Sequence, residues 1–132
     1  MKRWNLTNAQ VNFYSWAGAG WSRFGNNDAI SALVGSQFDA ESRRLYFNSQ
    51  VQVLLHPNAE NTWMTRISGG IAPYLANAGE IQGMMIVQAF HNTAIPGPWV
   101  IGPMIRMYYK SILLEVGSGF RGEWMLNLMT TF

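Results

Sequence analysis

The sequence contains no cysteine among its 132 residues. Disulfides, thiolate nucleophiles and cysteine metal sites are therefore excluded, and folding does not depend on an oxidising compartment. No apolar run approaches the roughly 20 residues that a membrane-crossing helix needs. The first ten residues carry a basic pair but lack the apolar core of a signal peptide. We therefore expect a chain made in the cytoplasm without a signal peptide.

Charge is also scarce. Charged residues make up 12% of the chain, about half the roughly 25% of ordinary globular domains. The net charge of +2 is too small to predict nucleic acid as a partner. Eight Met, six Trp and an excess of Arg over Lys are instead typical of protein interfaces. We expect part of the surface to be covered by neighbouring subunits, and we expect no membrane partner.

Alternating apolar and polar residues dominate the chain. Residues 43–55 place Leu45, Phe47 and Val51 on one side and Tyr46 and Asn48 on the other. This period of two predicts a long, half-buried strand. Similar patterns predict further strands over residues 9–16, 62–69, 80–92, 104–116 and 123–132.

Two segments favour short helices. Residues 26–35 begin with possible N-cap residues and end on Gly35, and residues 71–79 have Pro73 early and Gly79 at the end. Neither is long enough to connect parallel strands. We therefore predict an all-β fold, an antiparallel two-sheet sandwich or jelly roll over residues 11–132 with one or two helical inserts, preceded by an N-terminal arm at residues 1–10. An α+β fold is the alternative.

Catalytic signals are weak. His56 and His91 lie 35 residues apart, with no metal-ligand spacing such as HxH or HExxH. No serine stands in a GxSxG context. We expect no catalytic residue, no metal site, no cofactor and no enzyme activity.

The segment Ser15–Trp21 brackets Ala and Gly residues with two tryptophans. Small residues let backbones approach closely, while each indole can remove 150–250 Å² from water. Tryptophans beside flexible segments suit an interface or a stacking platform. The candidate interface or ligand contacts are Trp16, Trp21, Arg23, Asn26, Asn27 and Trp99, with Arg3 and Trp4 as contacts of the arm.

Low charge, abundant aromatics and no catalytic constellation favour a structural assembly protein. The profile of the whole chain resembles that of small virion proteins, such as the capsid-decorating (cement) and head-completion proteins of tailed phages. That resemblance implies a jelly-roll-like homo-oligomer, with a trimer favoured, bound to a capsid or other shell protein in the virion.

Two other functions remain open. A carbohydrate-binding module or lectin would use Trp21, Arg23, Asn26, Asn27 and Trp99. A hydrolase would need His91 beside Asp39 or Glu41.

Overall fold

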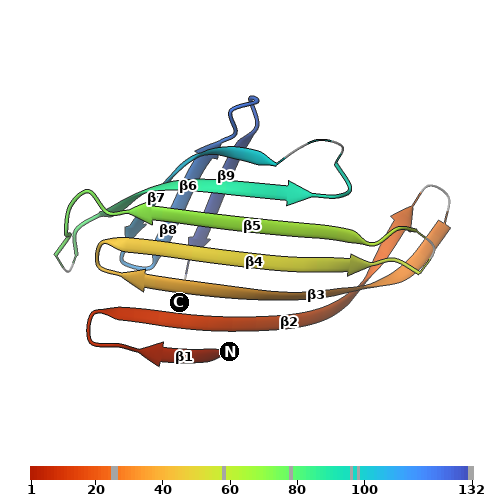
Figure 1. Cartoon of the computed structure of the whole chain (residues 1–132), viewed down its shortest axis with the longest axis horizontal. Coiled ribbons are helices and arrows are strands. Elements are labelled where there is room, and N and C mark those ends of the chain that lie inside the picture. Colours follow the sequence, from red (N-terminus) through yellow and green to blue (C-terminus); the bar gives the residue numbers. More distant parts are fainter. Residues whose placement is uncertain (25–26, 58, 78, 96, 98, 131–132) are drawn as a thin grey trace.

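The computed structural model is a single antiparallel sheet of nine strands (Figure 1). It describes every residue except 25–26, 58, 78, 96, 98 and 131–132, and not the side chains of Phe24 and Asn27. The strands are β1 (Lys2–Asn5), β2 (Ala9–Phe24), β3 (Asn27–Ser42), β4 (Leu45–Leu55), β5 (Thr62–Ile71), β6 (Gln82–Asn92), β7 (Val100–Tyr109), β8 (Ile112–Ser118) and β9 (Trp124–Thr130). The predicted all-β, antiparallel class is confirmed.

The predicted two-sheet sandwich is wrong. Each strand pairs with the next along the chain, so the order in the sheet is the order in the sequence. The sheet curls instead of splitting, and β8 and β9 pass behind the other strands in Figure 1. Curling of this kind follows from the right-handed twist that every pair of neighbouring strands adds.

The helix predicted over residues 26–35 is also wrong. β3 pairs with β2 without interruption, from Ala9 opposite Ser42 to Phe24 opposite Asn27. Sixteen-residue strands on both sides supply many ladder hydrogen bonds. These outweigh the capping signals, because local propensity is a weak preference that tertiary pairing overrides. Asn26 lies outside the described residues.

No helix forms in the described part of residues 71–79. Ile71 ends β5, and the chain then forms a loop in which the Tyr74 hydroxyl donates to the Ile81 carbonyl at 2.6 Å. The Asn77 amide donates to the Glu80 carboxylate at 2.8 Å, and this backbone hydrogen bond lowers the pKa of that carboxyl. A hydrogen-bonded loop therefore follows β5 in place of the predicted helix.

The single strand predicted over residues 104–116 is two strands. β7 and β8 form a hairpin around Lys110 and Ser111, with Lys110 at a φ of 52°. Turn positions with a positive φ usually hold Gly or Asn. Because Lys110 occupies this one, the turn could not be predicted from the sequence. In the arm, β1 pairs with residues Gln10–Phe13 of β2. Contact of the arm with a neighbouring subunit stays a prediction.

The hydrophobic core is very small. Among the described residues, only Ala72, Met84, Ile86 and Met104 are buried hydrophobics. Gly70 lies beside this cluster, since it pairs with Ile86. A Cβ at Gly70 would come within 2.6 Å of the Met85 carbonyl oxygen.

We therefore expect Gly70→Ala to destabilise the protein by about 1–3 kcal/mol, as overpacking of a well-packed site does. Gly69→Ala is the matched control, because its Cβ would meet only the Tyr46 carbonyl oxygen at 3.9 Å. Urea unfolding of the two variants measures the difference. Equal stabilities would show that β5 and β6 do not approach as closely as described.

Candidate functional site

The two faces of the sheet differ in chemistry, and one contact shows which face is concave. The Arg106 guanidinium of β7 donates to the Tyr46 hydroxyl of β4 at 3.0 Å, across the intervening strands β5 and β6. Side chains this far apart in a sheet meet only on its concave side. The concave face therefore carries Tyr46 and Arg106, and the alternate residues of each strand point to the convex face.

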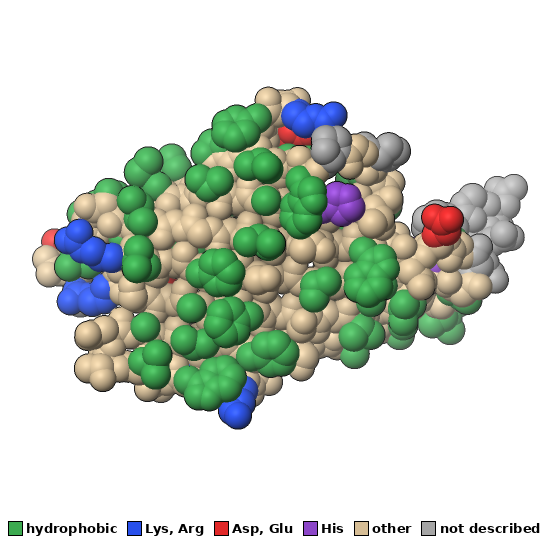
Figure 2. Space-filling model, in the orientation of Figure 1, with side chains coloured by type: hydrophobic (Ala, Val, Ile, Leu, Met, Phe, Trp, Pro, Cys, Tyr) green, Lys and Arg blue, Asp and Glu red, His purple; other side chains and the backbone are tan. Residues whose placement is uncertain are grey.

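The convex face is apolar. From β4 to β9, its strand positions include no Lys, Arg, Asp or Glu. Near the middle of five successive strands it exposes Val51 (38%), Ile67 (43%), Val87 (61%), Ile105 (53%) and Val116 (46%). Figure 2 shows hydrophobic side chains spread over this face, with charged groups near its margins. We call the five residues the apolar belt.

Tryptophans gather at one end of the sheet. Trp63 and Trp124 stand at the starts of β5 and β9, and Trp99 directly precedes β7. Because β5, β7 and β9 run in the same direction, their starts lie at the same end, where β2 also carries Trp21. The exposed fractions of these four residues range from 40% for Trp99 to 80% for Trp124. Trp99 also packs against His91, with ring centroids 5.4 Å apart.

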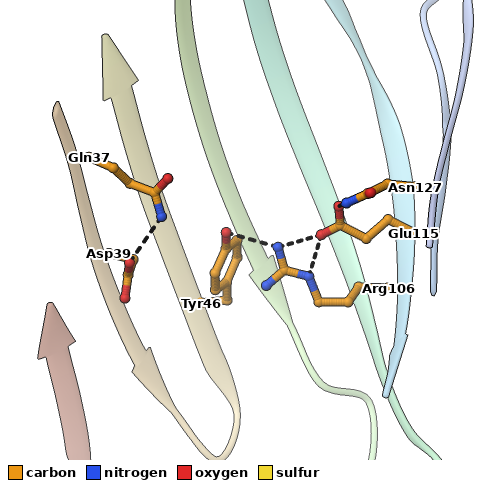
Figure 3. A network of polar contacts seen from close by, with 6 residues as sticks. All are labelled: Gln37, Asp39, Tyr46, Arg106, Glu115 and Asn127. Atoms are coloured by element: carbon orange, nitrogen blue, oxygen red, sulfur yellow. Dashed lines mark hydrogen bonds and ion pairs between the residues drawn. The ribbon is translucent and has the colours of Figure 1, made fainter. Parts of the chain in front are cut away.

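The concave face holds a charged network that crosses several strands (Figure 3). Arg106 Nε donates to Glu115 Oε1 at 2.7 Å, and Asn127 Nδ2 donates to Glu115 Oε2 at 2.9 Å. The guanidinium also lies 4.1 Å from the centre of the Tyr46 ring. The Arg106 and Glu115 side chains are only 19% and 7% exposed. The curl therefore buries this polar network on the same face as the small hydrophobic core of Met84, Ile86 and Met104.

Two further polar groups lie on the same face. Asn12 accepts a hydrogen bond from Arg3 Nε at 2.9 Å and donates to Asp39 Oδ2 at 2.7 Å. The Ser31 hydroxyl lies 2.9 Å from His56 Nδ1. Asn12, Ser31, Asn48 and Ser68 are all buried. The concave face thus buries polar side chains, several of which are hydrogen-bonded to one another.

The total exposed area reflects this arrangement. It is 9106 Å², against about 7,000 Å² for a compact monomer of 14.9 kDa. Among the described residues, most large hydrophobic side chains contribute to the exposed area, and the buried set contains more polar than hydrophobic residues. Contiguous apolar patches above a few hundred Å² mark a surface that contacts something other than water.

The structure separates the residues predicted for a sugar site. Trp21 lies on β2 and Trp99 beside β7, so five strand spacings, roughly 24 Å of sheet, stand between them. Arg23 pairs with Asp28 at 2.7 Å. The side chains of Asn26 and Asn27 lie outside the described part of the chain. Trp21, Arg23 and Trp99 therefore do not form one site.

The other candidate residues take different roles. Trp16 is half-buried on the concave face, where its ring lies so close to Gly35 that a Cβ at that position would clash with it. Trp4 is 40% exposed, with Lys2 Nζ 5.0 Å from its ring centre. Arg3 binds Asn12, as described above.

The residues of the hydrolase alternative are also apart. His91 points to the convex face beside Trp99, while Asp39 and Glu41 point to the concave face. Among the described residues, no three His, Asp or Glu side chains are grouped to hold a metal.

The apolar belt and the Arg106 network were not predicted from the sequence. One signal for the network was present: Arg106 and Glu115 face each other once the turn is placed at Lys110 and Ser111. The apolar belt could not be predicted, because the alternation of residues does not tell in which direction the sheet curls.

No helix in the described part of the chain has the length and apolarity to cross a membrane. Comparison of this chain with protein-family models, curated proteins and solved structures finds no match.

Proposed function

We propose that this chain is a membrane-embedded protein whose strands cross a lipid bilayer. Its convex face contacts acyl chains, and its concave face is turned away from lipid. The observation that carries this proposal is the inverted distribution of side chains: the apolar belt is exposed, while Asn12, Asn48 and Glu115 are buried. Membrane-spanning strands alternate in this sense, with apolar residues toward lipid and polar residues toward the interior.

The strand dimensions support the same function. The four central strands carry this argument: β4 and β6 have 11 residues, and β5 and β7 have 10, whereas β2 and β3 have 16 and β8 and β9 have seven. A strand tilted by about 45° needs 9–11 residues to cross the hydrocarbon core. The antiparallel ladders also satisfy the backbone N–H and C=O groups between neighbouring strands, as a medium without water requires.

The tryptophan row and the low charge fit this environment. Trp63, Trp99 and Trp124 lie at one end of the strands, and indoles concentrate at the boundary between lipid and water. Side chains that face lipid are rarely charged. Contact with lipid therefore explains why only 12% of the residues are charged, and neighbouring subunits need not cover the whole face. This proposal departs from the expectation, drawn from the sequence, that no membrane is involved.

The absence of cysteine permits a direct test by single-cysteine nitroxide labelling along β4. After folding into phosphatidylcholine vesicles, labels at Phe47, Val51 and Val53 are expected to collide with oxygen, which concentrates in lipid, and not with a water-soluble nickel chelate. Labels at Asn48 and Gln50 are expected to show lower oxygen accessibility, so that accessibility alternates with a period of two. Chelate access at the outward positions would refute membrane insertion.

A second candidate is the assembly function expected from the sequence, a virion component such as a decoration or head-completion protein. The observation that favours it is the same exposed belt, which subunits of a shell would also cover. In that case the outward labels would be shielded from both oxygen and chelate in the assembled particle, and the protein would not require lipid to fold.

A further inference from the structure

One long edge of the sheet lacks a partner strand. β1 pairs only with Gln10–Phe13 of β2. From Tyr14 to Phe24, β2 is paired with β3 on one side, and no described strand pairs with its other side. β9 is the opposite edge of the sheet, and its seven residues pair only with β8.

Such edges are unstable in a bilayer. Each unpaired backbone N–H or C=O in hydrocarbon costs several kcal/mol, so strand edges there must be hydrogen-bonded to another strand. In water, edges are commonly blocked by Pro, Lys or a bulge. The free edge of β2 has neither Pro nor Lys, and its one charged residue, Arg23, is held by Asp28.

Strand direction identifies what fits this edge. The nine strands alternate in direction, so β2 and β9 run opposite ways. A β9 strand can therefore add to β2 as an antiparallel neighbour, while it would run parallel to β1. The faces also agree, since β9 has Leu126 and Leu128 outward and Asn127 inward, and β2 has Trp21 outward and Trp16 inward.

The middle of the edge is open. A Cβ placed on Gly18 or Gly20 would meet no atom within 4 Å. Ala17 and Ala19 between them are equally small. The small residues of the segment Ser15–Trp21 thus leave the backbone of β2 accessible, and the tryptophans flank the accessible stretch.

We propose that two copies of this chain assemble edge to edge, with β9 of a second copy pairing antiparallel with Tyr14–Phe24 of β2, an arrangement that rests on the proposed function. A two-fold axis along the bilayer normal makes the contact reciprocal, so that the seven residues of each β9 pair with part of the free edge of β2 in the other copy. A second copy is needed because β9 does not pair with β2 of its own chain. The concave faces of the two curled sheets then face each other and keep their polar residues away from lipid.

Pairing of β2 with β2 of a second copy would also be antiparallel. It requires a two-fold axis perpendicular to the sheet, which inverts one copy relative to the bilayer. The tryptophan rows of the two copies would then lie at opposite membrane surfaces, and both β9 edges would stay unpaired. The β2–β9 contact leaves both copies in one orientation.

Disulfide formation between introduced cysteines tests the contact. Gly18→Cys or Gly20→Cys is combined with Met125→Cys or Met129→Cys, all on the concave face, where water and an oxidant reach them. Four such pairs cover neighbouring registers. After folding into vesicles and oxidation, we expect at least one pair to give a species of twice the 14.9 kDa chain mass in non-reducing gels. Mixing two single variants before folding should give the same species.

The controls separate the alternatives. Gln50→Cys, in the middle of the sheet, replaces the glycine variant and should give no dimer with Met129→Cys. An intramolecular disulfide, or a dimer from Gly18→Cys or Gly20→Cys alone, would overturn the β2–β9 contact between copies, as would no crosslink in any pair. The nitroxide pattern along β4, measured on the same preparation, stays alternating if only the edge contact is wrong and is lost if membrane insertion is wrong.

Discussion

Ile67→Arg is expected to destabilise the protein in lipid by about 2–4 kcal/mol, the cost of a cation on the lipid face at the bilayer midplane. Ile67 lies in the interior of β5, is 43% exposed and points outward in the apolar belt. An arginine there must carry its charge into hydrocarbon or distort the bilayer to reach water. Urea unfolding of the protein in phosphatidylcholine vesicles, followed by tryptophan fluorescence, measures the loss.

Two matched variants show whether lipid is the cause. Ile71→Arg places the same charge at the end of β5, where the cost near the membrane surface falls to about 0–1 kcal/mol. Gln37→Arg places it on the concave face beside Asp39, to which Gln37 Nε2 donates at 3.1 Å, and should change stability by less than about 1 kcal/mol. Equal costs at positions 67 and 71 would contradict a lipid environment, because a protein interface has no such dependence on depth.

The alternation of residues in β4 could be predicted from the sequence, but which of its two faces is buried could not. Leu45, Phe47 and Val51 form one face and Tyr46 and Asn48 the other, as expected from the period of two. A period of two separates two faces without saying which of them is buried. The period of two predicts a half-buried strand, and in water the apolar face of such a strand is the buried one. The contact of Arg106 with Tyr46 reverses this assignment, and it depends on a curl that no local pattern encodes.

The tryptophans show a second limit of sequence reasoning. Of Trp63, Trp99 and Trp124, the sequence singles out only Trp99 as a candidate contact. Their common property is a position at or just before the start of β5, β7 and β9. It becomes visible only when the hairpin turn at Lys110 is placed correctly, because that turn decides that β7 and β9 run the same way. Without this turn, the common position of the three tryptophans could not be predicted from the sequence.

Glu115→Gln is expected to destabilise the protein by about 3–5 kcal/mol, because it leaves a buried guanidinium without its counter-ion. The Glu115 carboxylate accepts from both Arg106 and Asn127, and its side chain is 7% exposed. The glutamine keeps the shape of the side chain but presents an NH₂ group to one of the two donors. The expected loss is therefore electrostatic and not a consequence of a cavity.

The double variant Arg106→Met with Glu115→Gln separates the pair from its surroundings. Removing both charges should restore most of the stability lost in Glu115→Gln, since replacing a whole buried ion pair is often neutral or stabilising. A double-mutant cycle completed with Arg106→Met gives the coupling energy, and direct contact between the residues requires it to exceed about 0.5 kcal/mol. If Glu115→Gln instead costs less than about 1 kcal/mol, as exposed ion pairs do, water reaches the network and screens it. The same measurement thus tells whether this part of the concave face is a packed polar core or the wall of a water-filled interior.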